Sequence, residues 1–266
     1  MAWLSSQAWF RKGCVLMQEY LDMIVSLLPG LWLSILMATV SILIGIPLGF
    51  VAGLILNGSN KALRWLTIAL VEIFRGFPAL LTLYLVYFGL AEIITLDRFA
   101  AVVAAFGVTT AAYTAEIFRA SIASVPRGQV EAAQALALTK KQITSRVVLP
   151  HVLNIAVPPV IGIAIITFQG TALAYAIGAK ELLGSAYSIG MINFRVLEPL
   201  LVAALLYLLF TSLLAWMEIL ADRRVARISG TSFDGGAGAA RRRQRRQRKT
   251  GFDASVLNTP ASKITQ

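Results

Sequence analysis

Residues 131–150, EAAQALALTKKQITSRVVLP, form a short polar stretch between long apolar stretches, and they decide how the chain is interpreted. Alanines lie among good helix formers at its start, a composition that lets the backbone of a partner approach closely. Thr139 and Gln142 then match a capping box, in which each side chain satisfies a backbone N–H at the start of a helix. We therefore expect two short helices with a break near Leu138.

Two roles are open for the acidic residue of this stretch. We expect Glu131 in the first turn of the first helix, where a carboxylate interacts favourably with the helix dipole. The same carboxylate would equally suit an arginine of a partner protein. For the whole stretch, the alternative to a partner-binding segment is an ordinary amphipathic connector between two spans.

The composition around this stretch is that of a membrane protein. Of the 266 residues, 58% are hydrophobic and only 14% are charged. A helix needs about 20 apolar residues to cross a bilayer core of about 30 Å, and several stretches here reach that length. We therefore expect an all-α, polytopic membrane protein with five transmembrane helices, at about residues 29–56, 65–94, 99–123, 152–177 and 190–220. A polar stretch at 180–188 precedes the fifth helix.

Three glycines in the first expected span, Gly45, Gly49 and Gly53, recur every four residues. Residues four apart lie on one face of a helix. Because small residues let two backbones approach, this spacing predicts a close contact with another helix. Pro47 lies among the three glycines, so we expect a kink there.

The basic residues predict the orientation of the helices. Loops on the side of the 131–150 stretch carry more Lys and Arg than the opposite loops, which places that side in the cytoplasm by the positive-inside rule. Five spans then place the N-terminus outside and the C-terminus in the cytoplasm. Residues 1–22 mix Trp and Tyr with charged residues, so we expect an interfacial segment before a transmembrane domain over 23–225.

A third region, 226–266, is expected to be a disordered cytoplasmic tail because it has too little apolar content to fold alone. It contains RRRQRRQRK at 241–249, a large part of the net charge of +11. Association with anionic membrane lipid is the favoured role of this basic segment. The alternatives are a passive solvated tail and RNA binding, and the chain offers no stacking aromatics or nucleic-acid fold for the latter.

Little in the sequence indicates an enzyme or a metalloprotein. A single cysteine, Cys14, excludes an internal disulfide, and one histidine makes a metal site improbable. We expect that histidine, His151, to be a hydrogen-bonding group at the membrane interface rather than a ligand. No G-x-x-x-x-G-K-[ST] motif is present, so any ATP must be hydrolysed on another chain. We expect no catalytic residues, no metal and no cofactor on this chain.

The polar stretch is similar to the EAA loop of ABC-type importer permeases, the cytoplasmic segment through which such a subunit contacts its ATPase. The matching positions are Glu131-Ala132-Ala133, Ala137 where the family usually has Gly, and Val147-Val148-Leu149-Pro150, with the spacing kept. The runs AYTAEIFRA at 112–120 and SVPRGQ at 124–129 resemble the polar amino acid uptake subfamily. RGFP at 75–78, and Gly178 with Glu181-Leu182, match two further segments, so the resemblance covers about residues 20–225.

This resemblance implies a type I ABC importer transmembrane domain that moves a polar amino acid, or a related compound such as an opine, by alternating access. It implies a second permease subunit, identical or different, two ATP-binding subunits, an extracytoplasmic solute-binding protein and a bacterial inner (plasma) membrane. The coupling segment is about 127–150. The residues implied in contact with the ATPase are Gly128, Glu131, Ala132, Ala133, Ala137, Leu149 and Pro150. Substrate-binding residues stay unassigned.

Two acid–base pairs lie in the expected spans, where an isolated charge is costly. Glu72 and Arg75 are three residues apart, as are Glu116 and Arg119, so each pair lies on one helical face and can neutralise itself. Together with Pro78, these residues are candidates for lining a gate or pathway. The alternative is structural pairing.

A stand-alone ion-coupled secondary transporter is the alternative function. It should show internal repeats and unpaired carboxylates within the membrane, and the sequence shows neither. A membrane enzyme is the other rival, and it would need converging catalytic groups that one histidine hardly supplies.

Overall fold

The structure is a computed structural model that describes the backbone of residues 2–228 and the side chains of residues 17–226. Packing divides the chain into two units, Met1–Asp222 and Arg223–Gln266. The second unit is described only over residues 223–228, which continue the last helix. The basic segment 241–249 and the rest of the predicted tail from residue 229 lie outside the described residues.

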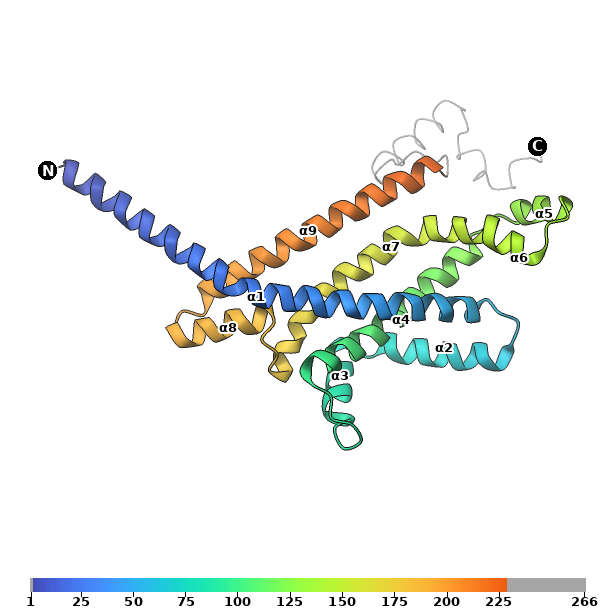
Figure 1. Cartoon of the computed structure of the whole chain (residues 1–266), viewed down its shortest axis with the longest axis horizontal. Helices are drawn as coiled ribbons and strands as arrows, with labels where there is room; N and C mark the ends of the chain where they lie inside the picture. Colours follow the sequence, from blue (N-terminus) through green and yellow to red (C-terminus); the bar gives the residue numbers. More distant parts are fainter. Residues whose placement is uncertain (1, 229–266) are drawn as a thin grey trace, which may run out of the picture. The chain divides into compact units, whose positions relative to one another are not determined.

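All elements described between residues 2 and 228 are helical, which confirms the all-α prediction (Figure 1). The α-helices are α1 Ala2–Leu56, α2 Lys61–Gly76, α3 Ala79–Tyr84, α4 Arg98–Ala123, α5 Arg127–Ala135, α6 Lys140–Ile143, α7 Leu149–Gly170, α8 Leu182–Asn193 and α9 Leu197–Ile228. Two π-helical turns, Leu85–Gly89 and Thr144–Val148, follow α3 and α6, and a 3-10 helix, Thr171–Ile177, follows α7.

Four helical segments of the described chain are long and apolar enough to cross a membrane: Met17–Leu56, Arg98–Ala123, Lys140–Ile177 and Leu197–Ala226. The predicted fifth is present if α2 and Ala79–Gly89, which meet at 106°, count as one broken span. The break follows from Pro78, because a residue before proline is pushed out of the α region. Phe77 accordingly has ψ 135°.

The starts of three predicted spans differ from the structure. The first span begins earlier than residue 29 because α1 stays helical through both Pro29 and Pro47. The fourth span begins at Lys140 rather than near residue 152, because α6 and its π-helical turn run directly into α7. The fifth begins at Leu197 rather than near 190, because much of the polar stretch 180–188 belongs to the separate helix α8. α8 ends where Phe194 adopts the left-handed conformation, with φ +54°.

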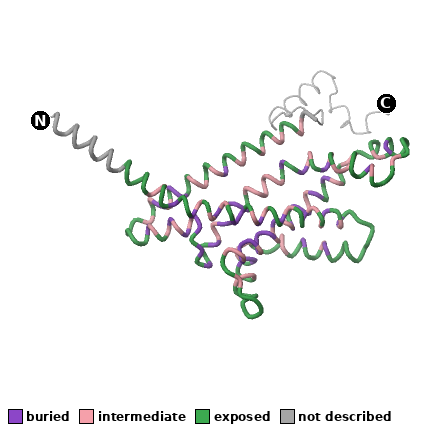
Figure 2. Tube along the Cα trace, viewed as in Figure 1, coloured by how far each residue is buried: buried purple, intermediate pink, exposed green. Residues whose placement is uncertain are grey.

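α4 is the central helix of the unit Met1–Asp222. In its most apolar window 61% of the residues are buried, against 17–28% in the other spans. By contrast, α2 is mostly exposed (Figure 2).

The outer side chains of the spans are large and apolar, as for Leu201, Leu205 and Leu208 of α9, each more than half exposed. Such a surface suits contact with lipid rather than water.

The three glycines of α1 bring it against α4, as their spacing predicts. A Cβ added at Gly45 would lie 2.7 Å from the carbonyl oxygen of Gly107, and one at Gly53 would lie 2.7 Å from the Cβ of Phe118. A Cβ added at Gly49 would be closer still and would collide with Oγ1 of Thr114. The two helices therefore pack with no room for side chains at these positions of α1.

Candidate functional site

The coupling segment folds into two short helices with a break between them, as the sequence predicts. The break is a Schellman motif, the hydrogen-bonded turn that closes many helix ends. The N–H of Ala137 donates to the carbonyl of Gln134 at 2.9 Å, and the N–H of Leu138 donates to that of Ala133 at 3.2 Å. Ala137 is left-handed, with φ +55°. It stands where EAA loops usually have Gly, the residue that adopts this conformation at least cost.

The predicted capping box is confirmed at the start of α6. The backbone N–H of Thr139 donates to Oε1 of Gln142 at 2.8 Å, and the N–H of Gln142 donates back to Oγ1 of Thr139 at 3.4 Å. α6 continues through a π-helical turn directly into α7. The capping box therefore fixes where the second helix of the segment begins.

The position predicted for Glu131 is wrong. α5 begins at Arg127, directly after Pro126, so Glu131 is its fifth residue and lies in the second turn. The helix dipole acts mainly on the first turn, which removes that role for the carboxylate. Glu131 is exposed, so the second expected role, pairing with a basic residue of a partner, stays a prediction.

Most of the residues predicted to contact the ATPase lie on the surface. Gly128, Glu131, Ala132, Ala137 and Pro150 are exposed, Leu149 is half-buried, and Ala133 is only 5% exposed. Ala133 therefore packs inside the segment rather than facing outward. Leu136, which no sequence motif indicates, is 76% exposed beside the left-handed residue. A large exposed side chain at the tip of a polar segment adds apolar area to this surface.

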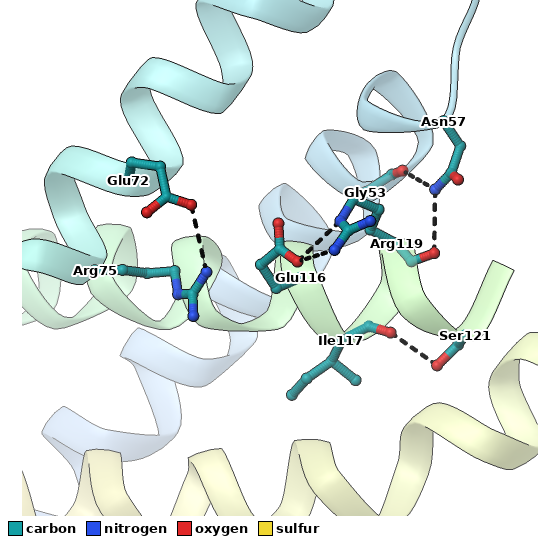
Figure 3. Close-up of polar contacts among 8 residues, drawn as sticks. All are labelled: Gly53, Asn57, Glu72, Arg75, Glu116, Ile117, Arg119 and Ser121. Atoms are coloured by element: carbon teal, nitrogen blue, oxygen red, sulfur yellow. Dashed lines mark hydrogen bonds and ion pairs between the residues drawn. The ribbon is translucent and has the colours of Figure 1, made fainter. Parts of the chain in front are cut away.

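The two predicted acid–base pairs form, each within one helix (Figure 3). On α2, Nη1 of Arg75 lies 3.6 Å from Oε1 of Glu72. On α4, Nε of Arg119 donates to Oε2 of Glu116 at 2.8 Å. These side chains are between 25% and 64% exposed, and exposed ion pairs of this kind contribute at most about 1 kcal/mol each to stability.

Further contacts join the ends of α1, α2 and α4 around these pairs. The guanidinium carbon of Arg75 lies 5.6 Å from the ring centroid of Tyr113 on α4, within cation–π range. Asn57, just after α1, donates from Nδ2 to the carbonyls of Gly53 at 3.0 Å and Arg119 at 3.3 Å (Figure 3). Pro78, the other pathway candidate, is exposed at the break after α2. The predicted gate residues other than Pro78 thus lie at a junction of three helices.

A buried carboxylate that the sequence does not predict as a site residue lies at the start of α8. Glu181 is fully buried and accepts hydrogen bonds from the N–H of Leu183 at 2.9 Å and of Gly184 at 2.7 Å. Ser34 of α1 and Tyr207 of α9 also donate to it, at 3.3 and 3.0 Å. Burial raises the pKa of the Glu181 carboxyl, and these donors oppose the rise. The only trace in the sequence is the family-like pair Glu181-Leu182.

An apolar cavity of about 260 Å³ lies between α1, α2 and α4. Among its lining residues, only Thr67 carries a polar side-chain atom. A polar solute would lose its hydrogen bonds to water there without replacement. We therefore assign no substrate-binding residues to this cavity.

His151 does not show the hydrogen bond expected of it. Its Nε2 is buried and has no hydrogen-bond partner within the described part of the chain. Nor do the described residues bring three or more His, Cys, Asp or Glu side chains together as metal ligands. The candidate site thus consists of the exposed surface of the coupling segment, the two acid–base pairs and the buried carboxylate of Glu181.

Residues 45–227, from the glycine contacts of α1 through the coupling segment to α9, match the family of binding-protein-dependent transport system inner membrane components. The chain belongs to this family. The membership confirms the resemblance drawn from the EAA stretch. Inner membrane components of this kind are transport subunits and not enzymes, and they act with an ATPase and a solute-binding protein.

Individual relatives of this inner membrane component are named as permease proteins of transport systems. It is 31% identical over 201 residues to the arginine transport system permease protein ArtQ of Bacillus subtilis, covering 75% of this chain and 92% of the relative. It is 32% identical over 200 residues to the L-cystine transport system permease protein TcyB of the same organism, covering 74% and 86%.

A solved structure agrees with the fold of this inner membrane component. The crystal structure of an amino acid ABC transporter with histidines superposes with a TM-score of 0.72 at 28% identity, over 79% of this chain and 97% of that one. The fold is therefore that of a type I ABC importer transmembrane domain, as predicted.

Proposed function

We propose that this inner membrane component translocates a polar amino acid, or a related compound such as an opine, by alternating access. The similarity to permeases named for arginine and L-cystine transport supports this substrate class. So does the likeness to an amino acid transporter solved with histidines. The proposed importer contains two permease subunits, identical or different, and two ATP-binding subunits. One solute-binding protein acts with it on the outer side.

The proposed orientation places the coupling segment and the C-terminus in the cytoplasm and the N-terminus outside. The excess of Lys and Arg in the loops on the side of α5 and α6 supports it. In this orientation a cytoplasmic ATPase can reach the exposed residues of α5. The binding protein then works from the opposite side, near the connection between α8 and α9.

The observation that carries the proposed mechanism is the exposed face of α5 at the end of two packed spans. Only residues 124–126 separate α5 from α4, and α6 leads through its π-helical turn into α7. α4 and α7 contact each other through the buried hydroxyls of Thr110 and Thr167, 3.0 Å apart. A push on the coupling segment would therefore move α4 and α7 together, and the glycine contacts would carry α1 with them.

The acid–base pairs at the end of α2 and α4 fit this mechanism in two ways. In the pathway reading, Glu72, Arg75, Glu116 and Arg119 line a gate at this end of the helices. In the structural reading, they neutralise charge on α2 and α4 and keep the three-helix junction together. The contact of Arg75 with Tyr113 supports the structural role, because it joins two helices.

Uptake into proteoliposomes tests the proposed function. The complex of this chain with its co-purifying subunits is reconstituted, and uptake of labelled arginine, cystine and glutamate is followed with internal or external ATP and with the binding protein added. We expect ATP-dependent accumulation of at least one of these solutes, and only with the binding protein present. Flux driven by an ion gradient through the chain alone would instead establish the secondary transporter.

A further inference from the structure

The fully buried carboxylate of Glu181 binds three helices together. Two of its hydrogen bonds come from the first residues of α8, one from Ser34 of α1 and one from Tyr207 of α9. Ser34 takes part twice, because its Oγ also accepts a bond from the N–H of Leu182 at 3.2 Å. We call Glu181, Ser34 and Tyr207 the carboxylate clamp.

α8 needs such a clamp because the helical path from α7 is broken before α8 begins. After the 3-10 helix, Gly178 takes a left-handed conformation with φ +76°, and α8 begins only at Leu182. α8 is also short, with twelve residues, so it cannot cross a bilayer alone. Backbone continuity therefore does not fix α8 relative to α7, and side-chain contacts must do so.

The packing around the clamp is close and leaves α8 little freedom. A Cβ added at Gly30 of α1 would lie 2.9 Å from the carbonyl oxygen of Glu181 and 2.7 Å from Oγ of Ser185. Leu27 of α1 and Leu182 of α8 are both fully buried in one apolar cluster that also includes Val202 of α9. The polar clamp and this cluster thus join the same three helices.

We propose that Glu181 is a positioning residue that makes α8 move as one body with α1 and α9 during transport. The inference rests on the proposed alternating access, which requires helices to move, and it adds which helices stay together. The physical basis of the proposal is the cost of breaking a hydrogen bond to a buried carboxylate. If any of the four donors moves away, an oxygen of Glu181 is left buried without that hydrogen bond. The clamp would keep the helix after the left-handed break from moving independently when the coupling segment is pushed.

Spin-label distances test the proposal without the need for a known substrate. Nitroxides are attached at Val25 of α1 and Ile192 of α8, both more than 60% exposed, in a chain whose Cys14 is replaced by Ser. In the complete complex we expect one narrow distance distribution that does not change when ATP is added. A distance that changes with ATP in the wild-type clamp would overturn the proposal.

Two variants of the clamp show whether it causes this behaviour. Tyr207→Phe removes one donor but keeps the ring beside Phe168, whose centroid is 5.2 Å away, and Glu181→Ala removes every bond. We expect the equilibrium to shift toward displaced α8 by about tenfold or more for a lost bond to the carboxylate. The distance distribution should broaden, and transport per ATP hydrolysed should fall while ATP hydrolysis per folded complex remains.

Thr211→Val provides the matched control on α9. It removes bonds that Thr211 makes only to the carbonyls of Tyr207 and Leu208 of its own helix, at 2.8 and 3.2 Å. This variant should keep both the narrow distribution and the wild-type ratio of transport to hydrolysis. If Tyr207→Phe and Glu181→Ala lower only thermal stability and leave the distance distribution and the ratio of transport to hydrolysis as in Thr211→Val, the clamp is merely structural and the proposal is wrong. Absence of amino acid transport by the wild type would count against the proposed function alone.

Discussion

The contact between α1 and α4 makes a sharp prediction for Gly49→Ala. The new Cβ would collide with Oγ1 of Thr114 and lie 2.7 Å from the carbonyl oxygen of Ala111. Neither neighbour can give way easily. The Thr114 hydroxyl is held by the carbonyl of Thr110 at 2.7 Å, and the Ala111 oxygen belongs to the helix backbone. α1 must therefore retreat from α4, by about 0.7 Å to restore a contact of 3.4 Å with that oxygen.

The magnitude follows from two opposing effects. Overpacking of this kind costs about 1–3 kcal/mol, and replacing Gly by Ala inside a helix recovers about 1 kcal/mol. We expect a net loss of up to about 2 kcal/mol, which lowers the Tm of a chain of this size by up to about 8 °C. The five tryptophans allow Tm to be followed by intrinsic fluorescence of the purified chain in detergent.

Gly107→Ala is the matched control because it lies in the same interface on α4. Its added Cβ would meet its nearest neighbours, Cγ2 of Ile44 and the carbonyl oxygen of Ser41, only at 3.8 Å, which is ordinary contact. We expect its Tm to be unchanged or higher through the gain in helix propensity. If Gly49→Ala is as stable as Gly107→Ala, the account of how α1 packs on α4 is refuted.

Three further predictions concern the coupling segment and the charged pairs. Ala137→Gly should stabilise the chain by about 1 kcal/mol, because φ +55° strains any residue with a Cβ, and a Tm below that of the wild type would contradict this. Thr139→Ala should destabilise α6 by about 1 kcal/mol through loss of the capping box, and amide exchange over Lys140–Ile143 should become faster. Because both side chains belong to the same capping box, adding Gln142→Ala to this variant should cause little further destabilisation. Arg119→Gln should change stability by no more than about 1 kcal/mol because its ion pair with Glu116 is partly exposed. Loss of transport at unchanged Tm would favour the pathway role, and unchanged transport would favour the structural role.

Local features of the sequence predict local structure well in this chain. The capping box of Thr139 and Gln142 depends only on residues three apart, and its geometry is confirmed. The contact face of Gly45, Gly49 and Gly53 follows from helical periodicity and from the absence of side chains. The acid–base pairs form for the same reason, because three-residue spacing in a helix brings two side chains together whatever surrounds them.

Features set by distant contacts are the ones that the sequence does not predict. Glu181 is bound by Ser34, 147 residues away in sequence, and no spacing rule relates the two. The separate helix α8 also depends on distant contacts, since Glu181, which Ser34 of α1 binds, caps it and α1 packs closely on it. The misplacement of Glu131 has a simpler cause. Pro126 lets α5 begin at Arg127, two residues before the helix-forming composition becomes evident.

We propose that the exposed face of α5 joins this permease to its ATPase, and co-purification of the two proteins measures this contact. The complex is isolated in mild detergent from cells that express the wild type, Glu131→Arg or Gln129→Arg. Gln129 is also exposed on α5, but it lies about 200° around the helix from Glu131, and equal Tm values show that all three chains are folded.

We predict that the wild type and Gln129→Arg bring down an active ATPase and that Glu131→Arg brings down little or none. If Glu131→Arg retains the ATPase as well as the wild type does, this face of α5 is not the contact. If the folded wild type brings down no ATPase at all, the ATP-driven mechanism for this chain is contradicted.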